Sequence, residues 1–163
     1  MLSKRELILI LFVAVAVLFR LLPHPPNFTP VTALAIFGAT TFTNKALGTI
    51  LPLIALGISD IFLGFSTITF WVYGSFILIS LLSIYWKQVK LQYVLLSSLV
   101  FFIVTNFGVW ILGYPKSLEG LVLCYTLAIP FFLNSILGDL FFTYVLKYSF
   151  KSVESKLNLK LCH

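Results

Sequence analysis

The chain has 163 residues, of which 60% are hydrophobic, 17% aromatic and only 10% charged. Soluble globular domains carry about 25% charged residues, so this composition excludes an ordinary soluble domain and predicts an integral membrane protein. The net charge of +6 comes from basic residues that lie singly or in pairs between apolar runs, without the basic stripe that nucleic-acid binding requires. We therefore expect one transmembrane domain over residues 1–163, with the lipid bilayer and not nucleic acid as its surroundings.

Apolar segments bounded by charges, prolines and glycines predict an all-α polytopic bundle of six transmembrane helices, because a spanning helix needs about 20 apolar residues. The first segment begins like a signal peptide, but it lacks a small-x-small cleavage site and is interpreted as a retained span. Pro130 is expected to kink the sixth segment. Residues 149–163 form a basic tail, expected in the cytoplasm. The six predicted spans cover residues 6–22, 30–43, 46–65, 66–86, 93–113 and 118–148.

The distribution of Lys and Arg predicts that both termini are cytoplasmic, because cytoplasmic loops are enriched in these residues. This arrangement leaves only Arg20 and Lys116 outside and places nine of eleven basic residues inside. The nine are Lys4, Arg5, Lys45, Lys87, Lys90, Lys147, Lys151, Lys156 and Lys160. Because the second segment has only 14 residues, a re-entrant hairpin with five spans and an outer N-terminus is the alternative; it places eight inside and three outside. The expected protein is therefore a multi-pass membrane protein.

The stretch from Arg20 to Ala35, RLLPHPPNFTPVTALA, interrupts the apolar pattern with four prolines. Proline fixes φ and removes a backbone donor, and the residue before it is pushed toward extended geometry. The stretch therefore predicts a rigid, non-helical connector between the first two segments. Irregular backbone at membrane depth is tolerated only where protein or a water-filled cavity surrounds it. This connector is the first place to look for a site.

In the six-span arrangement, polar and aromatic side chains of later segments lie near this connector, toward the outer side of the membrane. A charge within a membrane segment costs about 2.5–3.5 kcal/mol, so Arg20 and Asp60 need partners and are expected to be each other's. The opposing interpretation is that Arg20 extends to the lipid headgroups and that Asp60 only bridges helices. The predicted substrate-binding residues, which combine charge, hydrogen bonding and aromatic area as small-molecule sites do, are Arg20, His24, Asn27, Asp60, Trp71, Tyr73 and Asn106.

No catalytic residue, metal site or cofactor is expected. His24 has no partner with metal-ligand spacing, and Cys124 and Cys162 fall in different environments, which argues against a disulfide. The sequence has no Walker-type loop, HExxH, GxSxG or CxxC motif, so we expect a protein that is not an enzyme. An intramembrane enzyme using His24 with Asp60 lacks a nucleophile. Asp139 is placed near the cytoplasmic end of the sixth segment, where pairing with a basic loop residue or a partner protein is expected.

Small residues at Ala35, Gly38 and Ala39 form a small-xxx-small arrangement that permits close approach of two helices. Within one chain, such a face packs neighbouring helices. Between chains, it receives the helix of a partner. The second use defines an alternative function, a non-transporting membrane scaffold that binds partner proteins.

Several longer motifs carry a resemblance to known proteins. They are RLLPHPPNFTPVTALAIFG (20–38), SDIFLGF (59–65), WVYGSF (71–76), TNFGVW (105–110) and YPKSLEGLVLCYTLAIPFFLNSILGD (114–139). Through these motifs the chain resembles an uncharacterised family of small bacterial integral membrane proteins. This resemblance implies a multi-pass protein of the bacterial inner (cytoplasmic) membrane. The chain's size and six-helix topology are also similar to the S-components of energy-coupling-factor vitamin transporters. S-components bind vitamins or metal ions from the outside and dock onto a transmembrane coupling protein with ATPases.

The second resemblance implies a membrane substrate-binding transport subunit that captures a small molecule, such as a vitamin or cofactor precursor, from the outer side. Its partners would be that ligand, the bilayer and a transmembrane coupling protein with ATPases. S-components dock through an AxxxA pattern on their first helix. The AxxxA pattern of this sequence, from Ala35 to Ala39, lies in the second predicted segment instead.

Overall fold

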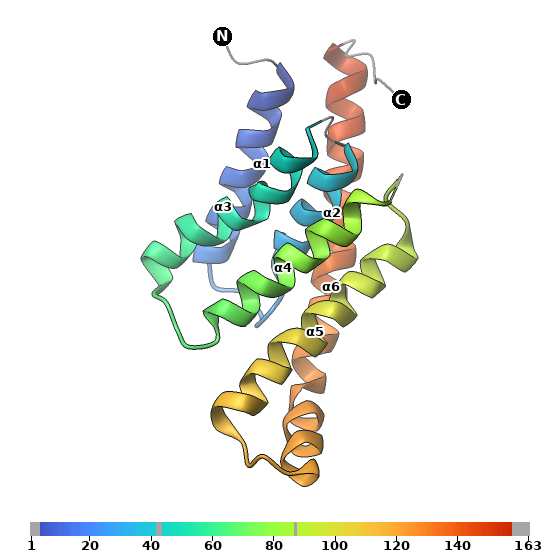
Figure 1. The fold of residues 1–163 in the computed structure, drawn as a ribbon. Helices are drawn as coiled ribbons and strands as arrows, with labels where there is room; N and C mark the ends of the chain where they lie inside the picture. Colours follow the sequence, from blue (N-terminus) through green and yellow to red (C-terminus); the bar gives the residue numbers. More distant parts are fainter. Residues whose placement is uncertain (1–3, 42–43, 87, 158–163) are drawn as a thin grey trace.

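The computed structural model describes residues 4–41, 44–86 and 88–157, which fold into six α-helices (Figure 1). The helices are α1 (Lys4–Leu21), α2 (Val31–Thr41), α3 (Lys45–Leu63), α4 (Thr69–Ile84), α5 (Leu91–Gly113) and α6 (Leu118–Leu157). The prediction of an all-α bundle of six helices is confirmed. Three helices are long and apolar enough to cross a membrane: α3, α5 and the Leu118–Val153 part of α6. Shorter apolar stretches are Ile10–Leu21, Val31–Thr40 and Thr69–Ile84.

Each helix falls on one of the predicted apolar segments. The largest difference is in α6, which continues as helix to Leu157 through most of the expected tail. Sequence-based expectations for residues 42–43, Lys87, Lys160 and Cys162 lie outside the described residues. The same holds for the side chains of Lys4, Arg5 and Lys156.

The short helix α2 forms the centre of the bundle. Residues 31–39 are all buried, as expected for a helix that is apolar on nearly every side. It packs against α1, α3, α4, α5 and α6. With 11 residues, α2 is roughly 16 Å long, about half the thickness of a bilayer's hydrocarbon core. The connector of residues 22–30 therefore delivers the N-terminal end of α2 to the interior of the molecule and not to one of its ends (Figure 1).

Two glycines set the close crossing of α2 and α3. A Cβ on Gly38 would lie 2.7 Å from the backbone oxygen of Gly48, and a Cβ on Gly48 would be closer still to the Gly38 carbonyl. Ala35 and Ala39 are fully buried on the same helix. The small-residue face thus packs helices of its own chain, and it is not a free surface for the partner helix that the scaffold alternative assigned to it.

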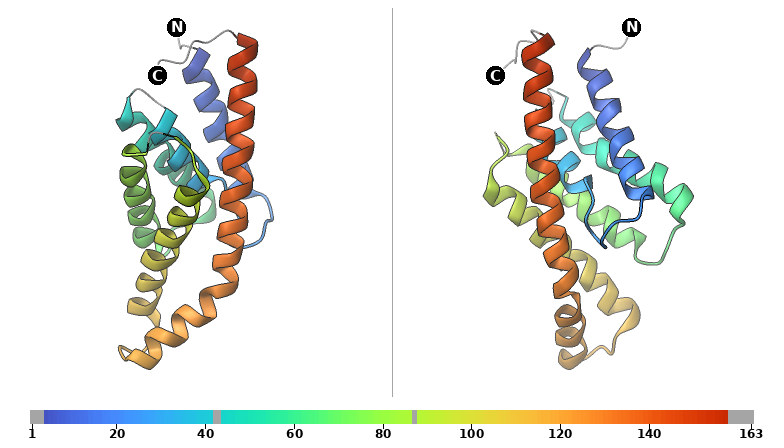
Figure 2. Two further views of the ribbon diagram at one scale, coloured as in Figure 1. Left: turned by 90° about the vertical axis from the view of Figure 1, so that its right-hand side faces the viewer. Right: turned by 180° about the vertical axis from the view of Figure 1, so that it is seen from behind.

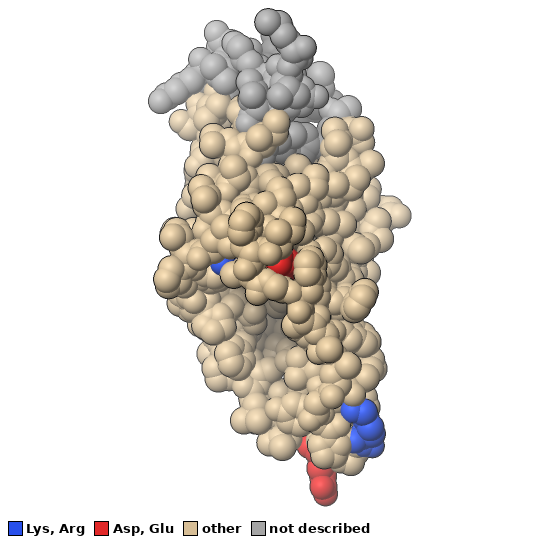
Figure 3. All heavy atoms as spheres, turned by 90° about the vertical axis from the view of Figure 1, so that its left-hand side faces the viewer, with Lys and Arg blue, Asp and Glu red and all other residues tan. Residues whose placement is uncertain are grey.

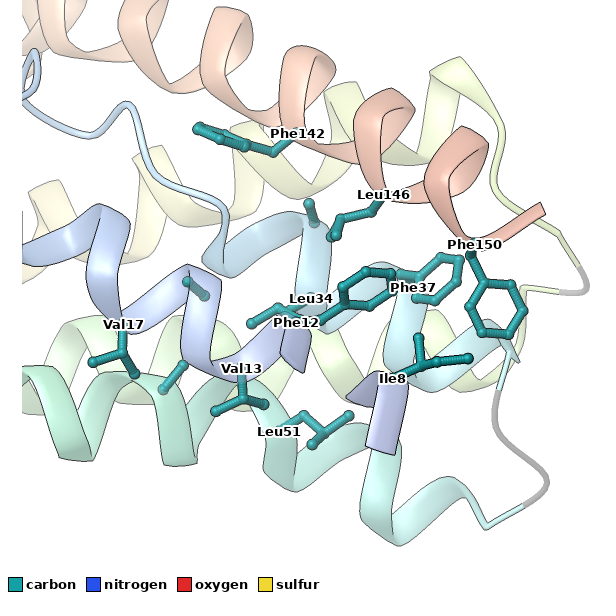
Figure 4. Packing of buried hydrophobic residues seen from close by; sticks show 13 residues of the cluster. Ile8, Phe12, Val13, Val17, Leu34, Phe37, Leu51, Phe142, Leu146 and Phe150 are labelled. Atoms are coloured by element: carbon teal, nitrogen blue, oxygen red, sulfur yellow. The ribbon is translucent and has the colours of Figure 1, made fainter. Parts of the chain in front are cut away.

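An apolar core joins α1, α2, α3 and α6 near the chain ends (Figure 4). Aromatic rings dominate it: the Phe37 ring lies edge-on to those of Phe12 and Phe150, at centroid distances of 5.9 and 5.0 Å. Edge-to-face pairs of this kind add to the stabilisation that burial itself provides. This core holds the upper half of the bundle in Figure 1 together.

The described ends of α1 and α6 lie at one end of the molecule, and the α5–α6 loop lies at the opposite end (Figures 1 and 2). The hairpin of α5 and α6 extends beyond the ends of α1 and α3 on that lower side. Figure 2 also shows that the N-terminal part of α6 is bent relative to the rest of the helix. Pro130 lies inside α6, where it removes a backbone donor, as in the predicted kink.

Candidate functional site

A cavity of about 230 Å³ lies at the N-terminal end of α2, and we call it the polar cavity. The end of α1, the connector and helices α2 to α6 all contribute to its wall. Six of its lining residues are apolar and seven are polar or charged, so the cavity is more polar than most small-molecule sites, which place a few polar groups in an apolar lining. The lining residues are Arg20, His24, Asn27, Thr29, Val31, Thr32, Leu56, Leu63, Val72, Phe76, Phe101, Ser135 and Asp139.

A second cavity of about 290 Å³, the adjoining cavity, shares Asn27, Val72 and Phe101 with the first. It continues toward the loop between α5 and α6. One face of the molecule is hollowed between its middle and its lower end (Figure 3). The remaining lining residues are Ile68, Thr105, Asn106, Val109, Tyr114, Cys124, Leu127, Ala128 and Phe131.

Arg20 and Asp60 form a salt bridge that ties the end of α1 to α3. Arg20 Nη2 donates to Asp60 Oδ1 at 2.6 Å, with side chains only 16% and 9% exposed. The pairing expected from the cost of buried charge is therefore present. Arg20 lines the polar cavity, whereas Asp60 lies outside its lining. A guanidinium has five N–H donors, and a single hydrogen bond joins it to Asp60 among the described residues, so other donors remain for a ligand.

Tyr73 lies close to Asp60 but does not line the polar cavity. Its ring is half-buried, and its hydroxyl oxygen is buried close to the Asp60 carboxylate. That hydroxyl makes no hydrogen bond with any residue that the structure describes. Tyr73 therefore lies next to the salt bridge and not in the proposed ligand site.

Asp139 corrects an expectation drawn from the sequence. Its side chain does not pair with a basic loop residue; it is 2% exposed and lines the polar cavity. Ser98 Oγ donates to its Oδ2 at 2.6 Å, and Thr32 lies beside the carboxylate. The sequence does contain a signal for this placement, because Ser135 and Asp139 are four residues apart and so share one face of α6.

His24 and Asn27 are placed on the polar cavity by the connector. His24 Nδ1 donates to the Leu22 carbonyl oxygen at 2.6 Å, and its ring lies 5.9 Å from that of Phe19. Asn27 adopts φ 64°, a left-handed conformation that asparagine tolerates. Both residues therefore shape the connector as well as lining the cavity. In the part of the chain that the structure describes, no three His, Cys, Asp or Glu side chains gather as a metal site would require.

Trp71 and Asn106, also predicted as ligand-binding residues, do not reach the polar cavity. Trp71 covers Gly108 of α5, and its ring lies 5.6 Å from that of Phe107. Asn106 Nδ2 donates to the Phe102 carbonyl at 2.8 Å, and Asn106 lines the adjoining cavity. Cys124, whose thiol lies 3.5 Å from the Asn106 carbonyl oxygen, is also there. The predicted set is thus divided between two levels of the bundle.

The comparison with family models covers nearly the whole chain. A model described as "Family of unknown function (DUF6580)" matches residues 1–160, and the chain therefore belongs to this family. No curated protein and no solved structure matches the chain.

Proposed function

We propose that this member of the family is an S-component-like substrate-binding transport subunit of the bacterial inner membrane, which captures a small molecule from the outer side. The polar cavity carries the proposal, because it collects buried charged and polar side chains in an otherwise apolar bundle. The ligand would be a small molecule such as a vitamin or cofactor precursor.

The cost of these charges supports a role in binding. Arg20, Asp60 and Asp139 are all buried or nearly so. Apolar residues of similar volume often stabilise a fold as well as a buried ion pair does, so folding alone does not require this pair. Ionisable residues inside membrane segments accordingly mark ligand, ion or proton sites by default.

The backbone around the cavity supports the same proposal. Irregular backbone at membrane depth is tolerated beside a cavity, and His24, Asn27 and Thr29 of the connector line the polar cavity. α2 is a half-length helix whose N-terminal end faces the cavity through Val31 and Thr32. Discontinuous helices with their ends at the ligand are the common way in which membrane transporters build a binding site.

Access from outside follows from the proposed orientation. With both chain ends in the cytoplasm, the α5–α6 loop is on the outer side, and the adjoining cavity leads from that side to the polar cavity. The sequence contains no nucleotide-binding loop, so uptake against a gradient would need a separate transmembrane coupling protein with ATPases, which belongs to the proposal as a partner.

Native mass spectrometry of the gently extracted protein tests the proposal. We expect a small molecule to be released from wild-type protein and to be much reduced in Arg20→Lys, which keeps the charge opposite Asp60 but loses the planar set of donors. Lys151→Gln, an exposed change on α6, is the matched control and should retain the molecule. Wild-type preparations that repeatedly release no small molecule, from cells in which the protein is made, would contradict the proposal.

A further inference from the structure

We propose that the ligand of the polar cavity carries a cationic nitrogen, and that Asp139 is its binding partner. This inference rests on the proposed function and adds the chemical class of the ligand to it. It follows from the balance of charge around the cavity, from the hydrogen-bond acceptors beside Asp139 and from the apolar wall opposite them.

With Asp139 ionised, the charges at the cavity do not balance without a ligand. Arg20 is the one Lys or Arg residue of the cavity wall, and its charge is matched by Asp60 at 2.6 Å. Asp139 forms no salt bridge with any residue that the structure describes. The other titratable groups nearby are His24, on the wall, and Tyr73, close to Asp60. With Arg20 and Asp60 paired, an ionised Asp139 would have no counter-charge at the cavity until a cationic ligand binds.

The immediate surroundings of Asp139 reduce the cost of this charge without cancelling it. Ser98 donates one hydrogen bond. The N-terminal end of α2, where Thr32 lies, contributes the partial positive charge of a helix terminus. A carboxyl group that is nearly inaccessible to water and has no counter-charge is more stable when it is protonated, whereas a cation beside it stabilises the ionised form. A ligand cation in the cavity supplies that counter-charge.

Ser135 provides a second acceptor for a protonated amine. Its hydroxyl donates to the Phe131 carbonyl oxygen at 3.0 Å, which uses its proton and leaves its oxygen lone pairs as acceptors. Ser135 and Asp139 stand four residues apart on α6, and both line the cavity. An ammonium group offers donors only, so this pair favours it over an anionic group.

The remaining wall matches the rest of such a ligand. Phe76 and Phe101 form an aromatic part of the wall, which suits an apolar ring or chain and adds cation–π attraction to an ammonium group. The free donors of Arg20 suit a carbonyl, hydroxyl or carboxylate at another position on the ligand. The volume of about 230 Å³ is below the roughly 300–1,000 Å³ of sites for drug-sized molecules, so the ligand is a small amine.

Three compounds of similar size separate charge from shape: 2-phenylethylammonium, 2-phenylethanol and phenylacetate. Each is added to the purified full chain, and affinity is measured from the shift in the thermal unfolding midpoint. We expect the ammonium compound to bind wild-type protein more tightly than the alcohol or the carboxylate. Asp139→Asn should weaken its binding about tenfold or more, the effect of losing one charge-assisted hydrogen bond. Glu119→Gln, an exposed change on the same helix, should leave it unchanged.

A second measurement on wild-type protein keeps the test decisive if Asp139→Asn does not fold. A hydrophobic carbodiimide modifies carboxyl groups in apolar sites, and peptide mass spectrometry reports the labelling of Asp139. The ammonium compound should protect Asp139, whereas the alcohol should not. Equal protection, or equal midpoint shifts for all three compounds, would overturn the charge assignment and leave small-molecule binding intact. If none of the compounds acts, the charge assignment is also overturned, and the co-purification experiment alone decides the proposed function.

Discussion

Arg20 both forms the salt bridge with Asp60 and lines the polar cavity, so the proposed function gives it two roles. Its Nη2 is bound to Asp60, which ties the end of α1 to α3, and the residue is part of the cavity wall. Lysine would satisfy the first role with its single charged nitrogen, but it lacks the planar donor set that suits the second. A stability measurement therefore reports on the salt bridge, and a ligand measurement on the remaining donors.

The salt bridge makes a prediction about stability. Arg20→Met or Asp60→Asn alone is expected to destabilise the protein by about 3–5 kcal/mol, because each leaves the other charge buried and unpaired. The double variant is expected to be much closer to wild type. Unfolding of all four proteins in detergent completes a double-mutant cycle. Lys151→Met serves as an exposed control, and strictly additive losses in the double variant would show that the two side chains do not act as a pair.

At the residue scale, the cost of buried charge was sufficient to predict the Arg20–Asp60 pair, because few residues in the sequence offered an alternative. The position of Asp139 was not predictable in the same way. Its distance along the chain from the loop indicated the cytoplasmic end of a span, but α6 is longer than a span and its middle passes the connector. The position of a residue along its helix predicts which residues of other helices it contacts only when the lengths of those helices are known.

At the scale of elements, the half-length of α2 decides where the site lies. A full-length second helix would have carried the connector to the outer end of the bundle. Instead, α2 begins beside Ser135 and Asp139, near the middle of α6. The close approach at Gly38 and Gly48 lets α3 cover this short helix along one side. The crossing of α2 and α3 therefore supports the wall of the polar cavity.

This crossing gives a second prediction, with a glycine control in the same chain. Gly48→Ala is expected to lower the unfolding free energy by about 1–3 kcal/mol, because its Cβ would collide with the backbone of α2 at Gly38. Gly74→Ala places a Cβ where no atom lies within 4 Å and is expected to stabilise α4 by about 0.5–1 kcal/mol. Unfolding in detergent distinguishes the two. A Gly48→Ala protein as stable as Gly74→Ala would contradict a backbone contact at this crossing.

The helices themselves were predictable from the sequence because apolar runs between charges and prolines leave few other conformations in a membrane. Which residues meet across helices was less so. Trp71 was expected to face a ligand, but its ring covers Gly108, whose missing side chain leaves room for it. A tryptophan in an apolar segment looks the same in the sequence whether it faces a cavity or a glycine. Whether the tryptophan faces a cavity or a glycine depends on which helix packs against its own and on how its helix is rotated about its axis. The sequence of one segment specifies neither.

At the scale of the whole molecule, helix lengths and chain ends bear on how the bundle lies in a membrane. α6 has 40 residues, roughly 60 Å, which is about twice the hydrocarbon thickness and means that part of it extends into water. Its last part carries Lys147 and Lys151, which suit the cytoplasmic surface. The described ends of α1 and α6 lie together at that end (Figure 2), which agrees with the proposed six-span arrangement.

Cysteine labelling tests this topology and separates it from the five-span alternative. In a background with Cys124→Ser and Cys162→Ser, single variants Ser3→Cys, Glu119→Cys and Ser152→Cys are treated with a membrane-impermeant maleimide, before and after permeabilisation. We expect Glu119→Cys, beside the α5–α6 loop, to react in intact cells, because the proposed orientation places that loop on the outer side. Ser3→Cys and Ser152→Cys should react only after permeabilisation. Reaction of Ser3→Cys in intact cells would show that the N-terminus lies outside. Reaction of Ser152→Cys in intact cells would show that the orientation is the reverse of the proposed one. The polar cavity would then receive its ligand from the cytoplasm.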